Sequence, residues 1–425
     1  MRETFKTLIT DFQERKPDNI IPREYDIPVD SEKIVSLVGV RRCGKTSILF
    51  DIINSLKKKV PSENIIYVNF EDDRLFPTEL GDLNHIMEGY YEMHPEKRHE
   101  TVYVFLDEVQ NIAGWERYVR RIYDTLNIRV FVTGSSSKLL SKEIATSLRG
   151  RTLTYEIFPY SFADFIKAKG IKVNFNSSDS VSYIKNALSE YLTDGGFPET
   201  VLQSADIKRR ILRDYLDLIV YKDIVERYGV KNNSLLKHII KYSFCNIGTL
   251  VSLNKLYNDL KSQGYKLSKD TVFDYYSYLE DAYAVFSIPV FRNSIREENR
   301  NPRKIYSVDN GFKGVYDAFV TDDFSKLYEN AVFLHLRRQT AEIYYYSGKQ
   351  EVDFYCVAEG KKTLVNVSYK IDSPKTRERE LNGLLEAMEY FKMSEAYLIT
   401  TDEEETFQQD DRTIHILPLW KWLLR

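Results

Sequence analysis

The feature that most constrains this chain is GVRRCGKT at residues 39–46, a stretch that meets the pattern G-x-x-x-x-G-K-[ST] in full. The apolar run Ile34–Val38 before it predicts a buried strand, and residues 47–53 after it predict a helix. In a strand–loop–helix of this kind the backbone N–H groups of the loop point into one concavity at the positive end of the helix. The stretch therefore predicts a site for a triphosphate.

The pattern also predicts a role for each part of this loop. We expect Lys45 to bridge β- and γ-phosphate oxygens and Thr46 to offer its hydroxyl to Mg²⁺, while Gly39 and Gly44 let the backbone turn and approach closely. The predicted cofactors are ATP and Mg²⁺. The residues expected to line the nucleotide are Gly39, Arg41, Arg42, Cys43, Gly44, Lys45, Thr46 and Ser47.

Two acidic residues follow the next strongly apolar strand, residues 101–106. The carboxyl ends of parallel strands meet at one edge of a sheet, so Asp107 and Glu108 are expected beside the phosphate loop. Asp107 would orient Mg²⁺ or its water, and Glu108 would act as the general base for γ-phosphate hydrolysis. The alternative is a carboxylate pair that merely begins a loop.

Weaker candidates come later in the same domain. A serine after the strand 128–133, Ser135 or Ser136, would sense the γ-phosphate, or it would simply cap the next helix. Arg149 and Arg151 would stabilise transition-state charge, in their own subunit or in a neighbouring one, or they would be solvated loop charges. Strands that alternate with helices through residues 33–160 predict a parallel, doubly wound α/β sheet, preceded by a helix and linker at 1–32.

Composition excludes several classes of protein. The net charge of -3 and the pI near 6.2 exclude a bulk polycation, so any nucleic-acid surface would be a local patch. Three widely spaced cysteines favour neither a disulfide framework nor a Cys-rich metal site. No apolar run reaches the length that spans a bilayer. We therefore expect a cytoplasmic protein with no membrane partner.

The motifs together carry a family resemblance. GVRRCGKT, YVNFED, VFLDEVQNI, VTGSSS, LRGR and FPYSFADF occur in that order, and later pieces match at 195–199, 221–224, 304–310, 348–354 and 416–420. Over almost its whole length the chain resembles prokaryotic AAA-type P-loop ATPases whose C-terminal domain of unknown function looks like a PD-(D/E)xK nuclease (the AAA_14/DUF4143 type). The resemblance implies an ATPase of the ASCE class that works as a switch or motor.

The segments after the ATPase domain have their own patterns. Residues 161–245 show helical periodicity and predict a helical lid, whose cluster Lys208–Arg210 with Arg213 would meet a phosphate backbone or form a solvated helix face. Residues 246–300 predict a winged-helix-like unit, with a strand pair or wing at 284–290. Lys266, Lys269 and Tyr275 are expected near its exposed face, although nearby acidic residues also favour a structural or protein-binding role.

Residues 301–425 predict helix, three strands, helix and strand, the core of a nuclease-like α/β domain. Such a site needs carboxylates for Mg²⁺ and a lysine that activates water. Glu329 and Asp353 occupy the first two places, but Asn366 and Ser368 stand where a carboxylate and the lysine are expected. Lys370 could replace that lysine from a position two residues further along the predicted strand. We favour an inactive nuclease fold used for binding.

The sequence thus predicts an ATPase that couples ATP binding and hydrolysis to rearrangement on a partner, and the partner that we expect is DNA, including branched DNA. A neighbour's arginine would require a homo-oligomer. Two alternatives stay open. One is an ATP-gated, metal-dependent nuclease, and the other is a signalling or scaffold ATPase that acts on a protein partner.

Overall fold

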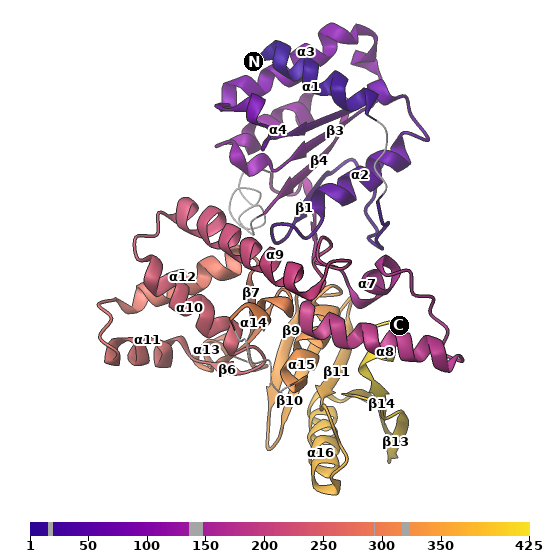
Figure 1. Cartoon of the computed structure of the whole chain (residues 1–425), viewed down its shortest axis with the longest axis vertical. Helices are drawn as coiled ribbons and strands as arrows, with labels where there is room; N and C mark the ends of the chain where they lie inside the picture. The colour runs from indigo at the N-terminus through magenta and orange to yellow at the C-terminus, as the bar shows by residue number, and fades with distance from the viewer. Residues whose placement is uncertain (16–19, 136–147, 293, 317–323) are drawn as a thin grey trace. The chain divides into compact units, whose positions relative to one another are not determined.

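A computed structural model describes residues 1–15, 20–135, 148–292, 294–316 and 324–425. The chain forms two compact units, and each is described by itself (Figure 1). The first comprises Met1–Phe158 together with Asp281–Tyr283, and the second comprises Pro159–Glu280 together with Ala284–Arg425.

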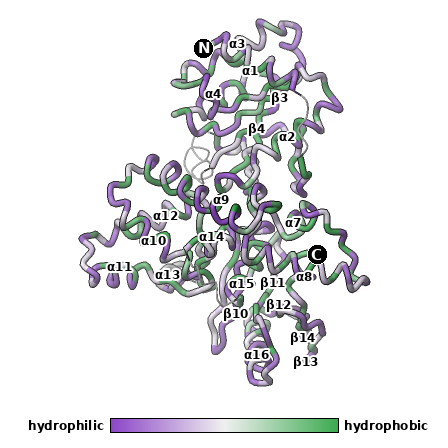
Figure 2. Tube along the Cα trace, in the orientation of Figure 1, coloured by the Kyte–Doolittle hydropathy of each residue, from purple (hydrophilic) through white to green (hydrophobic). Residues whose placement is uncertain are grey.

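The first unit is built on a five-stranded sheet in the order β2-β3-β4-β1-β5. All its neighbouring strands are parallel, which confirms the predicted α/β sheet. The strands β1, β3 and β4 are buried almost along their whole length, as covered parallel strands are, and hydrophobic residues gather in them in Figure 2. The bounds are β1 Ile34–Val38, β2 Ile65–Asn69, β3 Val102–Asp107, β4 Ile128–Gly134 and β5 Thr152–Glu156.

Helices accompany the sheet of the first unit. The predicted lead-in helix is α1, which packs on β2 and on α3 through an apolar face that includes Phe5, Leu8 and Ile9. The α-helices are α1 Arg2–Glu14, α2 Lys45–Leu56, α3 Asn84–Met93 and α4 Trp115–Thr125. Single 3₁₀ turns lie at Ser62–Asn64, Asp73–Leu75, Leu80–Leu83, Pro95–His99 and Val109–Asn111.

The second unit begins with helices, as the periodicity of residues 161–245 predicts. They are α7 Phe162–Ala168, α8 Ser178–Asp194, α9 Ala205–Leu218, a π-helical segment η6 Ile219–Glu226 and α10 Asn233–Cys245. The turn after α8 is held by a residue far away in the sequence, because the Gly196 N–H donates to Asp309 Oδ2 at 2.7 Å. Burial raises the pKa of the Asp309 carboxyl to about 7.

A small three-stranded sheet follows, in the order β6-β8-β7, with β6 Leu250–Val251, β7 Val285–Ile288 and β8 Arg303–Ser307. The two helices before β7 are α11 Leu253–Ser262 and α12 Lys269–Asp281, at the predicted places. The expected strand pair at 284–290 is instead one strand, β7, which pairs with β8. Tyr275 is buried in the apolar stripe of α12 rather than near the exposed face, whereas Lys266 and Lys269 are exposed.

The remaining chain forms a six-stranded mixed sheet in the order β13-β14-β12-β11-β10-β9. The helix α16 packs against it over a core that includes Leu384, Met388 and Leu398. The strands are β9 Ile343–Ser347, β10 Glu351–Ala358, β11 Lys361–Val367, β12 Glu395–Thr400, β13 Glu405–Gln409 and β14 Arg412–Pro418. The helices are α13 Ile295–Arg300, α14 Gly311–Tyr316, α15 Phe324–Arg337, α16 Pro374–Phe391 and α17 Leu419–Trp422. Helix, three strands, helix and strand therefore occur in the predicted order.

Candidate nucleotide-binding site

The phosphate loop lies between β1 and α2, at the carboxyl edge of the parallel sheet. Gly39 has a φ of +151° and lies so close to the next strand that a Cβ on it would meet Ile157 O at 2.0 Å. Gly44 caps α2 in the left-handed region, with a φ of +101°. Both positions require glycine, because side chains are disfavoured at these angles and no room is left at the first. The loop thus keeps its backbone N–H groups at the start of α2, where an anion is favoured.

Lys45 is the first residue of α2, and it is only 3% exposed. Its Nζ donates to two carbonyl oxygens of its own loop, Gly39 O at 3.1 Å and Val40 O at 3.2 Å. It also lies 3.7 Å from Glu108 Oε1. The Lys45 ammonium is therefore held inside the curve of the loop, where phosphate oxygens would replace the two carbonyls as its acceptors.

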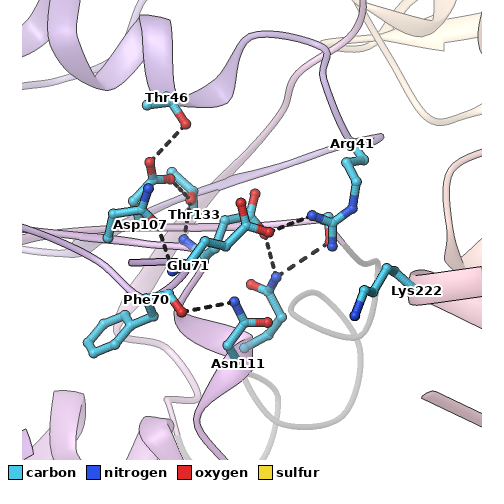
Figure 3. A network of polar contacts seen from close by, with 12 residues as sticks. Arg41, Thr46, Phe70, Glu71, Asp107, Asn111, Thr133 and Lys222 are labelled. Carbon is cyan, nitrogen blue, oxygen red and sulfur yellow. Dashed lines mark hydrogen bonds and ion pairs between the residues drawn. The ribbon is translucent and has the colours of Figure 1, made fainter. Parts of the chain in front are cut away.

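Asp107 ends β3 and is fully buried. The Thr46 hydroxyl donates to Asp107 Oδ2 at 2.8 Å, and Thr133 donates to Oδ1 (Figure 3). The Tyr67 hydroxyl also donates to Oδ2, at 2.8 Å. Burial raises the pKa of this carboxyl, although the three donors oppose the shift. Thr46 and Asp107 thus meet as a hydroxyl and a carboxylate oxygen, the hard donors that suit Mg²⁺. The two residues fit the ion that the loop pattern implies.

Glu108 follows β3 in a left-handed backbone conformation, with a φ of +53°. Burial by itself raises the pKa of its carboxyl, but the Lys45 charge and the amide of Gln110 outweigh burial and lower it. The Glu108 carboxyl is therefore held ionised, as a general base must be before it accepts a proton. Gln110 Nε2 also donates to Ser135 Oγ at 3.4 Å, so one amide links Glu108 to the end of β4.

The rim of the loop is polar. Arg41 pairs with Glu71 at 2.6 Å, and Asn111 Nδ2 donates to Phe70 O at 3.3 Å, so residues after β2 and β3 are tied to the loop region (Figure 3). Cys43 is buried, while Arg42 and Ser47 are exposed. Burial raises the pKa of the Cys43 thiol, which keeps it protonated and unreactive.

The other candidates of this unit are placed differently. Ser135 is buried at the end of β4, beside β3, and Ser136 lies outside the described residues. Arg149 is exposed, and Arg151 Nε donates to Asp124 Oδ1 at 3.0 Å. Both precede β5, whose first residue is in register with the first residue of β1. The two arginines therefore lie at the amino edge of the sheet, about 17 Å along β1 from the loop. That geometry disagrees with a role at the site of their own subunit, and it agrees both with a role at a neighbour's site and with the alternative of solvated loop charges.

The local sequence does not predict several residues of the site. Tyr67 and Thr133 reach Asp107 from the strands on either side of β3. Arg23, in the linker, donates to Cys43 O at 3.1 Å and to Phe158 O at 2.9 Å, so it braces the phosphate loop from outside. Gln110 alone could have been suspected, because it stands two residues after Glu108.

The second unit contains the predicted nuclease-like residues. Glu329 on α15 and Asp353 on β10 converge, but on Lys304 of β8. Asn366 on β11 donates to Glu380, and Ser368 lies just beyond the end of that strand. Lys370 is exposed beyond the strand rather than on it, with its ammonium over the Tyr369 ring. Among the described residues, no group of three or more His, Cys, Asp or Glu side chains could hold a metal ion.

The basic cluster of the helical segment, Lys208–Arg210 with Arg213, is only partly available as a basic surface. Lys208 is buried, and its Nζ pairs with Asp194 at 3.0 Å and with Glu190. Its charge is thus compensated inside the fold. Arg209 and Arg210 are exposed. No helix in the described part of the chain is long and apolar enough to cross a membrane.

Comparison of the sequence with known proteins identifies family models that match this chain and related proteins. Residues 31–166 match the model of an AAA domain, while residues 185–338 and 324–422 match two domains of unknown function, DUF8612 and DUF4143. An uncharacterized protein of Methanocaldococcus jannaschii is 36% identical over 99% of this chain and 95% of its own length. An uncharacterized protein of Haemophilus influenzae is 30% identical over 93% of this chain and 95% of its own length.

Similarity to solved structures is much weaker. The Walker-type ATPase of Pyrococcus abyssi covers 74% of this chain and 95% of its own, with 14% identity and a TM-score of 0.42. The Orc1 protein of Aeropyrum pernix in complex with DNA covers 75% and 91%, with 13% identity and a TM-score of 0.32. Likenesses at this level do not indicate a shared function.

Proposed function

This chain belongs to a family of archaeal and bacterial proteins that carry an AAA domain of the P-loop ATPase type and a DUF4143 domain, and from that premise we propose that it binds Mg-ATP and hydrolyses it. The observation that carries the proposal is the meeting of two pairs at one sheet edge. The Thr46 hydroxyl donates to Asp107 Oδ2 at 2.8 Å, and Lys45 Nζ lies 3.7 Å from Glu108 Oε1.

The side chains divide the work. Lys45 leaves its loop carbonyls for phosphate oxygens, and Thr46 and Asp107 hold Mg²⁺. The ion, when bound, neutralises charge that develops on the phosphates. Glu108, released from Lys45, accepts a proton from the attacking water. Ser135, linked to Glu108 through Gln110, would sense the γ-phosphate.

We further propose that hydrolysis drives rearrangement on a partner and that the active form is a homo-oligomer. The exposed Arg149 supports the second point, because it would serve a neighbour's site better than its own. DNA is the first partner to test, since Lys266 and Lys269 are exposed at the helices 253–281. The buried ion pairs of Lys208 remove one expected phosphate contact, so a protein partner is the second candidate.

The decisive experiment measures ATP hydrolysis by the full chain without DNA and with single-stranded, duplex and branched DNA. We expect Mg²⁺-dependent turnover that Lys45→Ala abolishes and that an exposed control, Lys361→Ala, preserves. Stimulation by one form of DNA would support DNA as partner, and it should weaken steeply with salt. Turnover indifferent to every DNA would favour the protein partner, and turnover that survives Lys45→Ala would contradict the proposed site.

A further inference from the structure

The most unusual group in the second unit is a buried lysine among carboxylates. Lys304, on β8, is 2% exposed. Its Nζ lies 2.8 Å from Asp353 Oδ1, 3.1 Å from Glu329 Oε1 and 2.7 Å from Glu351 Oε1. One ammonium thus binds three carboxylates from two elements, α15 and β10.

Each carboxylate oxygen of Glu329 and Asp353 accepts a hydrogen bond from the chain. The Tyr306 hydroxyl donates to Glu329 Oε1 at 2.8 Å, and Lys326 Nζ donates to Glu329 Oε2 at 3.1 Å. The backbone N–H of Val367 donates to Asp353 Oδ2 at 2.8 Å. Each oxygen of Glu329 and Asp353 therefore has a donor from the chain, and the lysine supplies the donor that faces both residues.

Such a cluster needs a cation. Burying a carboxylate without a partner is strongly unfavourable, and the buried carboxylate of Glu329 beside the partly buried one of Asp353 needs positive charge between them. Burial by itself lowers the pKa of Lys304, but attraction by Asp353, Glu329 and Glu351 outweighs it and raises the pKa well above 10.5. The surrounding carboxylates therefore favour the charged ammonium.

With Lys304 in place, no group of three or more His, Cys, Asp or Glu side chains among the described residues could hold a metal ion, but the oxygens around Lys304 are of the type that metal ions bind. Carboxylates from a helix and a strand are ligands that Mg²⁺ and Mn²⁺ prefer, at about 2.0–2.2 Å. Glu351 has a side chain that is 41% exposed, so the cluster opens to solvent on that side. Three carboxylates face two ammonium groups, Lys304 and Lys326, and removal of Lys304 leaves two negative charges in excess, which one divalent cation would balance.

We propose that Lys304 is a built-in cation that takes the place of a divalent metal among Glu329, Glu351 and Asp353. The wild-type protein binds no metal there, and loss of the ammonium opens a metal site. Because Lys304 comes from the small sheet while the carboxylates come from α15 and β10, the ion pairs also fasten these segments of the second unit together. The inference does not depend on ATP hydrolysis.

The test uses the full chain without nucleotide and Mn²⁺ as the probe. Bound Mn²⁺ is counted by electron paramagnetic resonance, and thermal unfolding is followed with and without Mn²⁺. We expect no stoichiometric Mn²⁺ in the wild type or in the exposed control Lys361→Ala. Lys304→Ala should gain one Mn²⁺ per chain and a higher melting temperature with the ion, and the double variant Lys304→Ala/Asp353→Asn should lose both gains.

Other outcomes decide the proposal as well. Stoichiometric Mn²⁺ in the wild type that Asp353→Asn removes would overturn it. If Lys304→Ala folds only when Mn²⁺ is present, the ion has replaced the ammonium and the proposal holds. If Lys304→Ala fails to fold with or without Mn²⁺, the second variant is Lys304→Gln, which removes the charge but keeps a neutral hydrogen-bond donor on a slightly shorter side chain. A folded Lys304→Gln or Lys304→Ala without any gain in Mn²⁺ binding would refute the idea.

Discussion

Replacing Glu108 by glutamine should change two properties in opposite directions. The substitution keeps the shape of the side chain but removes the charge that faces Lys45 at 3.7 Å. Hydrolysis should fall because the amide accepts no proton. Affinity for ATP should rise because Lys45 no longer has to leave a carboxylate before it meets the phosphates.

The structure sets the size of both effects. Two unit charges 3.7 Å apart attract by about 4 kcal/mol at an effective dielectric of about 20 and by about 1 kcal/mol in water. Lys45 keeps its two loop carbonyls in the variant, so we expect about 1–2 kcal/mol of that attraction to appear as tighter binding, roughly tenfold in Kd. Loss of a general base slows the chemical step by about 10²–10⁴-fold.

The assay separates binding from chemistry. Titration with a fluorescent ATP analogue and Mg²⁺ gives Kd, and single-turnover hydrolysis gives the rate of the chemical step. The matched control is Glu96→Gln, an exposed glutamate of the same unit that should change neither quantity. Hydrolysis by Glu108→Gln within threefold of wild type would refute its role as base, and an unchanged Kd would refute the competition for Lys45.

Three further predictions follow from the same structure. Gly39→Ala places a Cβ 2.0 Å from Ile157 O, so nucleotide binding should be lost and the melting temperature should fall; normal ATP binding in a titration would contradict this. Tyr67→Phe removes one donor from Asp107, which should lower the free energy of unfolding by about 1–3 kcal/mol in urea titrations, whereas a change below the error would show that Thr46 and Thr133 suffice. Burial lowers the pKa of His335 to about 4, so the folded state resists its protonation. His335 alone should therefore remove about 2–3 kcal/mol of unfolding free energy as pH falls from 6.5 to 4, and this loss should appear as the difference between the wild type and His335→Phe over that range, because the pKa of Asp309 near 7 acts in the opposite direction in both proteins.

The nucleotide-binding loop was the part of the molecule most open to prediction. Its glycines, lysine and threonine carry their meaning in local spacing, since each acts within one turn of the chain. Strands with unbroken apolar runs predicted the parallel sheet for a similar reason, because only strands covered on both faces read that way. The position of Asp107 and Glu108 then follows from the rule that parallel strands end at one edge.

Contacts between distant segments were out of reach. Two of the three hydroxyls that donate to Asp107, those of Tyr67 and Thr133, belong to neighbouring strands, and sheet order cannot be read from one sequence. Lys208 looked like part of a basic surface, but its carboxylate partners lie 14 and 18 residues earlier, on α8. Lys304 lies 25 residues from Glu329 and 49 from Asp353. Nothing in the spacing of these residues signals that a lysine would replace a metal ion.

The cation among the carboxylates of the second unit, the ammonium of Lys304, is covalently part of the chain. The two units therefore differ in how they depend on the concentration of free metal ions. A chelator, or a fall in the free Mg²⁺ of the cell, empties an ion site by mass action, but it cannot withdraw the ammonium of Lys304. Starvation for Mg²⁺ would thus silence the nucleotide site of the first unit while the joint between β8, α15 and β10 stays closed. The supply of one ion would control turnover without loosening this joint of the second unit.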